Sequence, residues 1–390
     1  MKIAILTSGI LPVPAVQGGA VENLIDFYLE YNNQHHLHDI TVYSIWHPDV
    51  DKHPAQNSQV NHYKYIKVDG PYPKFKKKWY QLTHGQEYYH YTIEYYLHEA
   101  IKDIRHKDFD AIIMENRPAY ALKVKNVTDA KLVYHLHNEK LGEKTRDAHD
   151  IYDAAACILT VSKYIKSRVV TINHNDTKTK VVYNGIDLSA FNNNVVTSRS
   201  SLGLKEDDFI LVFSGRINRD KGIMELIEAM NLLKVHSHIK LMVIGSNFFG
   251  NAKSDDAFTM ELKAKAKPLE ERIRFTGFIP YSILPQYLWI SDVAVVPSVW
   301  EEPFGNTVVE AMAAGLPLIT TRSGGIPEIC EGVAMIVERD NVVDHLAAAI
   351  LDLYQHPEKR QQMAATSLKR SKLFDKETYA KNFFAALEAL

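Results

Sequence analysis

The chain has 390 residues, of which 46% are hydrophobic and 24% are charged, and its formal net charge is −2. This length and composition are typical of a soluble globular protein with two or three domains. The near-neutral charge excludes a global field that would steer the chain to nucleic acid or membrane. The two cysteines are far apart, the start lacks a signal-peptide pattern, and no apolar run approaches the roughly 20 residues of a membrane span, so the sequence predicts a cytoplasmic protein.

In the first half of the chain, short apolar runs alternate with amphipathic helical stretches. The runs predict buried strands at Ile3–Leu6, Ile40–Ile45, Ala111–Met114, Lys131–Leu136 and Cys157–Val161. Between the first two runs, apolar residues recur at helical spacing from Val21 to Tyr28. This alternation predicts an α/β domain with a parallel, doubly wound sheet.

Two adjacent glycines, Gly18 and Gly19, follow the first expected strand and precede a helix that we expect to begin at Ala20. Glycine lets a backbone approach a diphosphate closely, and a helix N-terminus supplies N–H donors. The spacing is neither Gly-x-Gly-x-x-Gly nor a Walker loop, so it does not predict a plain dinucleotide or ATP site. A tight turn without a ligand is the alternative interpretation.

The stretch from Trp46 to Tyr96 is rich in His, Tyr and Lys, and it contains Lys74-Phe-Lys-Lys-Lys-Trp79-Tyr80. One interpretation is an insertion at a membrane interface, with lysines touching anionic headgroups and aromatic residues at the boundary. The other is a solvated face whose aromatic residues are tucked onto the domain.

His137, in Tyr134-His135-Leu-His137-Asn138, lies at the carboxyl end of an expected strand of the first domain. Ligands of doubly wound domains usually bind at that end, so His137 is expected to face a cleft between two domains. The alternative is a histidine that only packs in the core.

The alternating pattern breaks around 181–193, where polar residues follow the end of a strand, and we place a domain boundary near residue 195. A second alternating set predicts strands at Phe209–Phe213, Lys240–Ile244, Ile273–Phe275, Val293–Val296 and Leu318–Thr320. We expect a first domain over 1–195, a second over 196–370, and a final helical segment over 371–390 that crosses back to the first domain.

Two cations follow the first strand of the second domain. Arg216 lies in the loop and Lys221 where the next helix begins. Arg offers a planar fork to phosphate oxygens and Lys a point charge, so the pair suits a departing nucleoside diphosphate. Two ordinary exposed cations are the alternative. Gly245 and Phe278, at later strand ends, are candidates for lining a base pocket.

Two glutamates frame the segment Glu302-Pro-Phe-Gly-Asn-Thr-Val-Val-Glu310. Asn306 is expected to cap a helix over about Thr307–Ala314, with Gly315 at its left-handed end. Glu302 would then precede the helix and Glu310 would lie in its first turn. Such a site can hold an anion and offer carboxylates to hydroxyls, as a sugar nucleotide requires. A solvated acidic turn is the alternative.

Together these motifs resemble the retaining glycosyltransferases of family 4, which have the GT-B fold. The resemblance covers nearly the whole chain and rests on Gly18-Gly19, His137, Asn184-Gly-Ile-Asp187, Ser-Gly-Arg216 with Lys221-Gly222, and Glu302–Glu310. Pro12–Glu22 is most similar to bacterial members involved in spore-coat and other surface polysaccharides. The resemblance implies two Rossmann-like domains facing across a cleft, the first on the acceptor side and the second binding the donor.

The resemblance also implies a role for each motif. Arg216 and Lys221 bind the donor diphosphate, which Gly18 and Gly19 approach from the first domain. Glu302 contacts the transferred sugar, helped by the backbone N–H groups of Phe304, Gly305, Asn306 and Thr307. Glu310 holds the ribose, and His137 lies beside the sugar and the acceptor. Asn306-Thr307 stands where many members carry two aliphatic residues, so the donor sugar cannot be transferred from better-known members.

These features predict a retaining transferase that moves a hexose-type sugar from a UDP- or GDP-linked donor to a hydroxyl of a glycan, lipid-linked or protein-linked acceptor. We expect no cofactor, no metal and no nucleic acid partner; peripheral contact with the inner face of the membrane is left open. Two alternatives remain: a sugar-nucleotide epimerase of the same fold, and a non-catalytic nucleotide-binding partner of another transferase.

Overall fold

The computed structural model describes residues 1–83, 91–191, 197–246 and 256–390. It divides the chain into an N-terminal unit, formed by Met1–Gly185 with Lys376–Leu390, and a C-terminal unit, Ile186–Asp375. The boundary expected near residue 195 falls within 192–196, outside the described residues. The end of the chain therefore belongs to the unit in which the chain begins.

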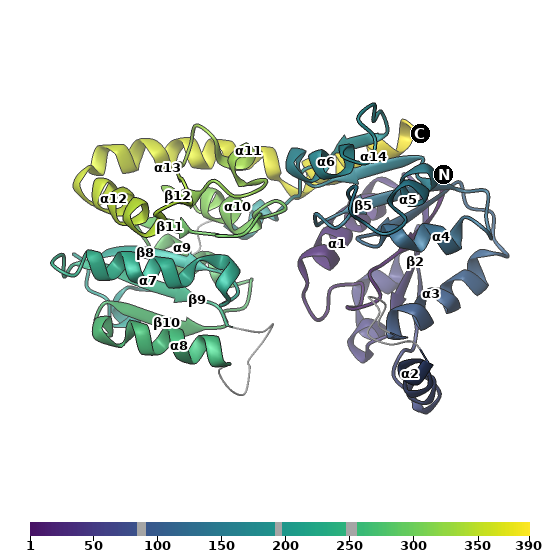
Figure 1. Ribbon diagram of the computed structural model, residues 1–390, viewed down its shortest axis with the longest axis horizontal. Helices are drawn as coiled ribbons and strands as arrows, with labels where there is room; N and C mark the ends of the chain where they lie inside the picture. The colour runs from purple at the N-terminus through teal and green to yellow at the C-terminus, as the bar shows by residue number, and fades with distance from the viewer. Residues whose placement is uncertain (84–90, 192–196, 247–255) are drawn as a thin grey trace. The chain divides into compact units, whose positions relative to one another are not determined.

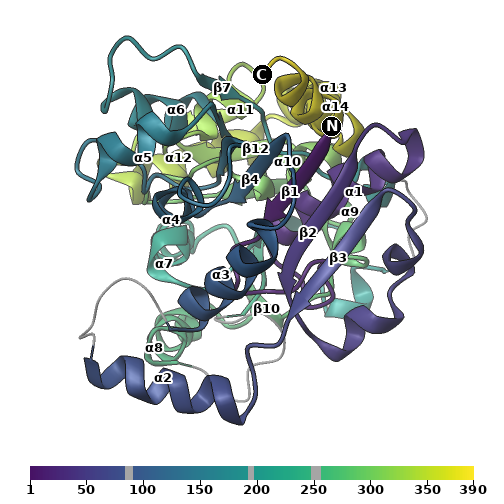
Figure 2. The ribbon, with the colours of Figure 1, turned by 90° about the vertical axis from the view of Figure 1, so that its right-hand side faces the viewer.

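The N-terminal unit is built on a seven-stranded parallel sheet in the order β3-β2-β1-β4-β5-β6-β7 (Figures 1 and 2). Its strands are β1 (Lys2–Leu6), β2 (Asp39–Ile45), β3 (Asn61–Ile66), β4 (Ala111–Glu115), β5 (Lys131–Leu136), β6 (Cys157–Thr160) and β7 (Thr179–Val181). The central strands are apolar and almost wholly buried, as in parallel sheets covered on both faces. They form the core that positions the loops at their ends.

The helices of this unit are α1 (Ala20–His35), α2 (Pro71–Thr83), α3 (Tyr91–Ile104), α4 (Ala121–Val124), α5 (Ala148–Ala154), α6 (Lys163–Val170) and α14 (Lys376–Glu388). Helices α1 and α14 contact each other, and the ring of Tyr28 stacks on that of Phe383 with centroids 4.1 Å apart. The yellow α14 in Figure 2 is therefore part of the same core as the purple β1 and α1.

The C-terminal unit is built on a six-stranded parallel sheet in the order β10-β9-β8-β11-β12-β13. Its strands are β8 (Phe209–Ser214), β9 (Ile239–Ile244), β10 (Ile273–Gly277), β11 (Val293–Val296), β12 (Leu318–Thr321) and β13 (Met335–Val337). Its helices are α7 (Ile223–Leu232), α8 (Ala257–Ala266), α9 (Leu284–Trp289), α10 (Asn306–Ala313), α11 (Ile326–Cys330), α12 (Val342–Gln355) and α13 (Pro357–Ser371). Apolar residues of α7, α8 and α12 form one buried cluster with the sheet.

These two sheets confirm the predicted α/β class with two Rossmann-like domains. Every predicted strand exists, with ends that differ by at most two residues. The prediction missed β3 because its sequence, Asn-His-Tyr-Lys-Tyr-Ile, is largely polar, as suits an edge strand. It also missed the three-residue edge strand β13.

Both sheets have one point at which the strand order reverses. The order runs outward in both directions from β1 in the first sheet and from β8 in the second. In open α/β sheets, ligands bind beyond the carboxyl ends of the strands that flank such a point. The loops after β1, β4, β8 and β11 are therefore where a site is expected within each unit.

A surface hollow of the N-terminal unit lies at the amino ends of its strands, opposite the carboxyl ends where a site is expected. It is lined by residues that begin strands, such as Lys2, Asp39 and Asn61, together with Lys107 and Phe109. We assign no function to it, because the amino ends of parallel strands are not where doubly wound sheets bind their ligands.

Candidate active site

The loop after β1 brings the two glycines to the start of α1, which begins at Ala20 as predicted. Gly18 and Gly19 have φ values of 74° and 109°, in the region that favours glycine. A Cβ atom on Gly19 would lie 2.2 Å from Oε2 of Glu22. Glycine is therefore required here for backbone geometry and for close packing, whatever ligand the loop binds.

Glu22 is a buried carboxyl that the sequence reading did not single out. It accepts a hydrogen bond from the hydroxyl of Ser8 at 3.3 Å. Burial raises the pKa of Glu22 to about 7, and the charge of Glu115 adds to that shift against the effect of its hydrogen bonds.

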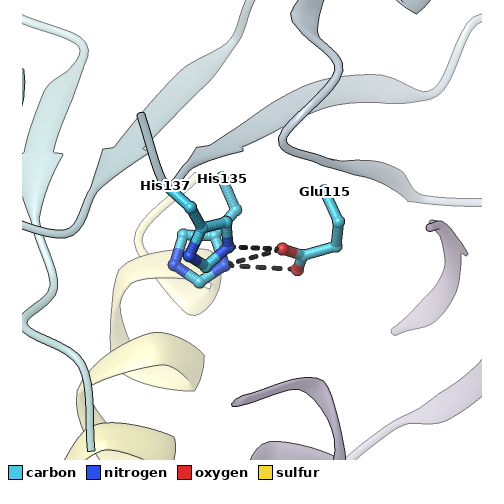
Figure 3. Close-up of side chains that lie close together, drawn as sticks. All are labelled: Glu115, His135 and His137. Atoms are coloured by element: carbon cyan, nitrogen blue, oxygen red, sulfur yellow. Dashed lines mark hydrogen bonds and ion pairs between the residues drawn. The ribbon is translucent and has the colours of Figure 1, made fainter. Parts of the chain in front are cut away.

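At the carboxyl ends of β4 and β5, three titratable side chains meet (Figure 3). The Nε2 atom of His137 lies 2.9 Å from Oε2 of Glu115, and Nδ1 of His135 lies 3.1 Å from the same oxygen. The side chains of Glu115 and His135 are fully buried, and that of His137 is 6% exposed. His137 thus follows β5 at its carboxyl end, as predicted, with its ring turned toward Glu115.

The two histidines keep Glu115 ionised. Burial alone would raise the pKa of Glu115, but the charge of His135 and hydrogen bonds from both rings lower it to about 2. Burial and the neighbouring His135 lower the pKa of His137 to about 4, although Glu115 opposes this. At neutral pH the cluster therefore contains a carboxylate and an uncharged His137.

The backbone around His137 is fixed by Asn116, which follows β4 in a left-handed conformation with φ 58°. Its side-chain oxygen accepts a hydrogen bond from the His137 backbone N–H at 3.2 Å and another from the Asn138 amide at 2.8 Å. The ends of β4 and β5 are thereby tied together. The position of His137 is thus set by the backbone and by its ring partner.

In the C-terminal unit, the loop after β8 carries both predicted cations. Arg216 is exposed, and Asn218 accepts a hydrogen bond from the backbone N–H of Lys221 at 3.2 Å. Gly222 has φ 68°, and a Cβ on it would lie 1.8 Å from the carbonyl oxygen of Pro297. Only glycine allows this contact, which presses the loop after β8 against the residue following β11.

That contact brings Lys221 to Glu302. The Nζ atom of Lys221 donates a hydrogen bond to Oε1 of Glu302, and Ser298 Oγ donates to the same oxygen at 2.7 Å. The side chain of Glu302 is 7% exposed and that of Lys221 is 20% exposed. Lys221 Nζ also lies 5.7 Å from the ring centroid of Trp300. Two residues 81 positions apart therefore form one partly buried ion pair.

The loop after β12 fixes the backbone of Glu302. The backbone N–H of Gly325 donates to the carbonyl of Glu302 at 2.7 Å. A Cβ on Gly324, whose φ is 51°, would lie 2.2 Å from that carbonyl oxygen. The backbone of Glu302 is consequently held by glycines that the sequence reading did not single out.

The start of α10 corrects one prediction. The cap residue is Gly305, with φ 100°, and Asn306 is already the first helical residue. Glu310 therefore lies beyond the first turn of α10, not within it. Gly305 is the cap because the chain enters the helix in a left-handed conformation. Asparagine tolerates this conformation better than most residues do, but glycine tolerates it best. Gly315, with φ 71°, does follow the end of the helix in the predicted left-handed conformation.

The other predicted donor residues differ in exposure. Phe304 is 2% exposed and its ring packs edge-on against Phe374, so its side chain belongs to the core and only its backbone remains for a ligand. Thr307 and Glu310 are partly buried. Burial raises the pKa of Glu310 to about 7. A hydroxyl that donated a hydrogen bond to Glu310 would favour its ionised form.

Gly245 and Phe278 lie where the sequence placed them, after β9 and β10. A Cβ on Gly245 would lie 1.9 Å from the carbonyl oxygen of Gly215, and its backbone N–H donates to Gly277 at 2.9 Å. Phe278 is 40% exposed. The glycines are thus explained by the close approach of three strand ends, and the base pocket stays a prediction.

Two groups of described residues could offer three ligand atoms to a metal ion, namely Glu115, His135 and His137, and Asp207, Asp208 and His238. In the second group Asp207 and His238 are exposed and Asp208 is buried. The expectation of a metal-independent site stays a prediction.

The family model described as "Glycosyl transferases group 1" matches residues 195–370. The Bacillus subtilis protein YtcC, named as a glycosyltransferase, is 30% identical over 385 residues, which are 95% of this chain and 87% of YtcC.

The chain belongs to the group 1 glycosyltransferases.

Spore coat protein SA of Bacillus subtilis is 28% identical over 100% of this glycosyltransferase and 99% of its own length. A crystal structure of Anabaena HepE in complex with UDP-glucose has a TM-score of 0.73 and 21% identity, with 100% of both chains covered. That likeness supports the GT-B fold. Arg216, Lys221, Glu302 and Glu310 of this glycosyltransferase all lie in the stretch that the family model matches.

Proposed function

We propose that this glycosyltransferase moves a hexose-type sugar from a nucleoside diphosphate donor to a hydroxyl acceptor, with retention at the anomeric carbon. The observation that carries the proposal is the Lys221–Glu302 pair at the carboxyl ends of β8 and β11. One partner can neutralise a leaving diphosphate, while the other can accept hydrogen bonds from sugar hydroxyls.

The chemical task is to stabilise a departing diphosphate and a sugar that becomes oxocarbenium-like. Arg216 and Lys221 supply fixed positive charge where negative charge develops, which is the largest contribution available to a site of this type. Glu302 binds the sugar and, until the donor arrives, neutralises Lys221. Glu310 binds the ribose in its ionised form.

Retention follows from a same-face substitution, in which the acceptor hydroxyl attacks on the side of the leaving group. The departing phosphate oxygen takes the acceptor proton, so the protein needs no separate base. His137 contributes a hydrogen bond to a substrate hydroxyl. The backbone N–H groups at the start of α10 add donors directed at the donor sugar.

The donor is proposed to be UDP- or GDP-linked, and the acceptor to be a hydroxyl of a surface glycan or glycoconjugate. Support comes from the name of Spore coat protein SA and from the UDP-glucose complex of HepE. Among the described residues of the C-terminal unit, no contact distinguishes the two bases.

Helix α2 supports a further part of the proposal, a peripheral contact with the membrane surface. Tyr72, Phe75, Trp79 and Leu82 recur along one side of the helix at helical spacing and are 58%, 69%, 64% and 78% exposed. Lys74, Lys76 and Lys78, between them, are also exposed. Apolar residues flanked by lysines suit an anionic lipid surface. Among the described residues, no helix is both long enough and apolar enough to cross a membrane.

A vesicle experiment tests this contact. Vesicles rich in phosphatidylglycerol should sediment the protein, and vesicles of phosphatidylcholine alone should not. Phe75→Ser with Trp79→Ser should abolish sedimentation, whereas Val235→Ser, at a site 79% exposed in the other unit, should not. Equal sedimentation of all three proteins would remove α2 from the membrane proposal.

A thermal-shift panel of UDP- and GDP-linked sugars tests the main proposal. A donor that binds the native state raises the midpoint by mass action, by an amount that grows with its concentration. The matching donor should then transfer its sugar without forming an isomer when no acceptor is present. A flat panel would contradict the donor site, and an isomer formed from donor alone would identify an epimerase.

A further inference from the structure

Glu115 is the centre of a hydrogen-bond network that none of the proposed steps yet uses. Its Oε1 accepts from the hydroxyl of Tyr28 at 2.9 Å, and its Oε2 lies 2.9 Å from Nε2 of His137. Nδ1 of His135 lies within 3.2 Å of both oxygens. One buried carboxylate is thus shared by three donors, from α1, from β5 and from the residue after β5.

The network determines which nitrogen of His137 carries the proton. An ionised carboxylate can only accept hydrogen bonds, so the Nε2 atom facing Glu115 must be the protonated one. A neutral imidazole carries one proton, which leaves Nδ1 with a free lone pair. Nδ1 is buried and no described group donates to it. In Figure 3 the second nitrogen of each ring points away from Glu115.

We propose that Glu115 is a positioning residue, which holds His137 in the Nε2–H tautomer so that Nδ1 accepts a hydrogen bond from a substrate hydroxyl during sugar transfer. This inference rests on the proposed function. A buried acceptor without a protein donor costs free energy unless a ligand supplies the donor. A sugar or acceptor hydroxyl is the donor that a glycosyltransferase brings to this place.

His135 and Tyr28 act on Glu115 rather than on the substrate. The ring of His135 lies 5.4 Å from that of Phe383 and is fully buried, so it cannot turn to solvent. Phe383 in turn stacks on Tyr28. Both donors to Glu115 are therefore held by the same aromatic core of α1 and α14, and the carboxylate is held in one orientation.

A metal ion bound by the same three side chains is the competing interpretation. Two features favour the hydrogen-bond network. Oε1 of Glu115 is already engaged by Tyr28. Metal-bound histidines normally donate their second N–H to a partner, and here His135 Nε2 and His137 Nδ1 have none among the described groups.

The tautomer can be read directly by long-range ¹H–¹⁵N NMR correlation of the histidine rings in the full-length, ligand-free protein. The wild type should show protonated Nε2 and bare Nδ1 for His137. Glu115→Gln replaces one acceptor oxygen by an N–H donor, so it should move His137 toward the Nδ1–H tautomer. Loss of the partner that orients a metal-bound histidine lowers activity by about 10- to 100-fold. By analogy, we expect kcat to fall by a similar factor with little change in donor KM.

Tyr28→Phe is a graded comparison, because it removes one donor from the same carboxylate and keeps the ring that stacks on Phe383. It should keep the Nε2–H tautomer, since His137 still faces a carboxylate, and it should lower kcat less than Glu115→Gln does. Glu115→Asp, which keeps the charge, should restore part of the kcat lost in Glu115→Gln.

Three outcomes would overturn the inference. They are an Nδ1–H tautomer in the wild type, a stoichiometric metal ion on the purified protein that shifts both ring nitrogens, or a tautomer change in Glu115→Gln without loss of kcat. The ring measurement needs no substrate, so a wrong tautomer defeats this inference even where sugar transfer by the wild type upholds the proposed function.

Discussion

The two units hold their buried carboxylates in opposite ways. Glu115 in the N-terminal unit is fully buried, receives three donors from rigid elements and keeps a pKa of about 2. Glu302 in the C-terminal unit is 7% exposed and receives Ser298 and the long, flexible side chain of Lys221. A lysine can leave its partner for a phosphate at little cost, because its ammonium group is a point charge on a mobile stem. The comparison separates a network that fixes geometry from an ion pair that can exchange partners.

The largest expected effect is on the exchangeable pair. Lys221→Ala should fold normally and lose about 3 kcal/mol of transition-state stabilisation, by analogy with removing one preorganised donor from a developing anion. The measurement is kcat/KM at saturating acceptor. Arg219→Ala is the matched control, since Arg219 is an exposed cation two residues away that pairs with Glu261 at 2.6 Å. Near-normal kcat/KM in Lys221→Ala would contradict the assignment of Lys221 to the donor diphosphate.

The two glutamates of the donor site should then separate kinetically. Glu302→Gln removes a charge that is proposed to contact the reacting sugar, so kcat should fall because the activation free energy rises by about 2 kcal/mol, the value of a hydrogen bond to a charged group. Its nucleoside diphosphate affinity should not weaken, because Lys221 is released from its partner. Glu310→Ala removes a contact made equally in ground and transition states, so donor KM should rise with little change in kcat. A KM-only defect in both variants would contradict this division.

A pH series tests whether burial destabilises the ionised form of Glu310, which lacks, among the described residues, the donors that keep Glu115 ionised. The folded-state pKa of Glu310 is raised from 4.5 to about 7, so the folded protein binds more protons than the unfolded chain between those values. Wild-type stability relative to Glu310→Gln should therefore fall as pH rises from about 4.5 to 7 and stay constant above. Partial solvent screening limits the effect to about 2–4 °C, the midpoint shift for 1 kcal/mol in a domain of this size. A wild-type advantage that grew with pH in this window would show that the carboxyl is stabilised in its ionised form.

The smallest expected effect is that of a chelator. Arg216 and Lys221 are proposed to neutralise the diphosphate, so transfer should continue unchanged in EDTA. Activity that is lost in EDTA and returns with magnesium or manganese would place a metal in the site and reassign the cations.

The sequence predicted what depends on local chemistry. Hydrophobic runs located the central strands, and Gly315 could be placed at the left-handed end of α10 because a positive φ suits few other residues. The edge strand β3 escaped because it lacks a continuous apolar run. The cap of α10 is Gly305 and not Asn306. The backbone conformation in which the chain enters the helix therefore outweighs the preference of the asparagine side chain for a cap position.

The side-chain clusters could not be predicted from the sequence, because they depend on contacts between residues far apart in the chain. Lys221 and Glu302 were each singled out, but their pairing depends on Gly222 approaching Pro297, which no local pattern encodes. Glu115 was missed although it ends a buried strand in register with His135. A charged residue at the end of a buried strand, beside a His-x-His strand end, is the signal that was present and unused.

The stacking of Phe383 on Tyr28 has a consequence for biosynthesis. Helix α14 packs into the core of the N-terminal unit, so this unit cannot complete its packing until the ribosome has made α14, after the whole C-terminal unit. The C-terminal unit, being continuous in sequence, has all its residues earlier. Order of synthesis and order of completion are thus reversed, and the surroundings of Glu115 are complete only after α14 has been made.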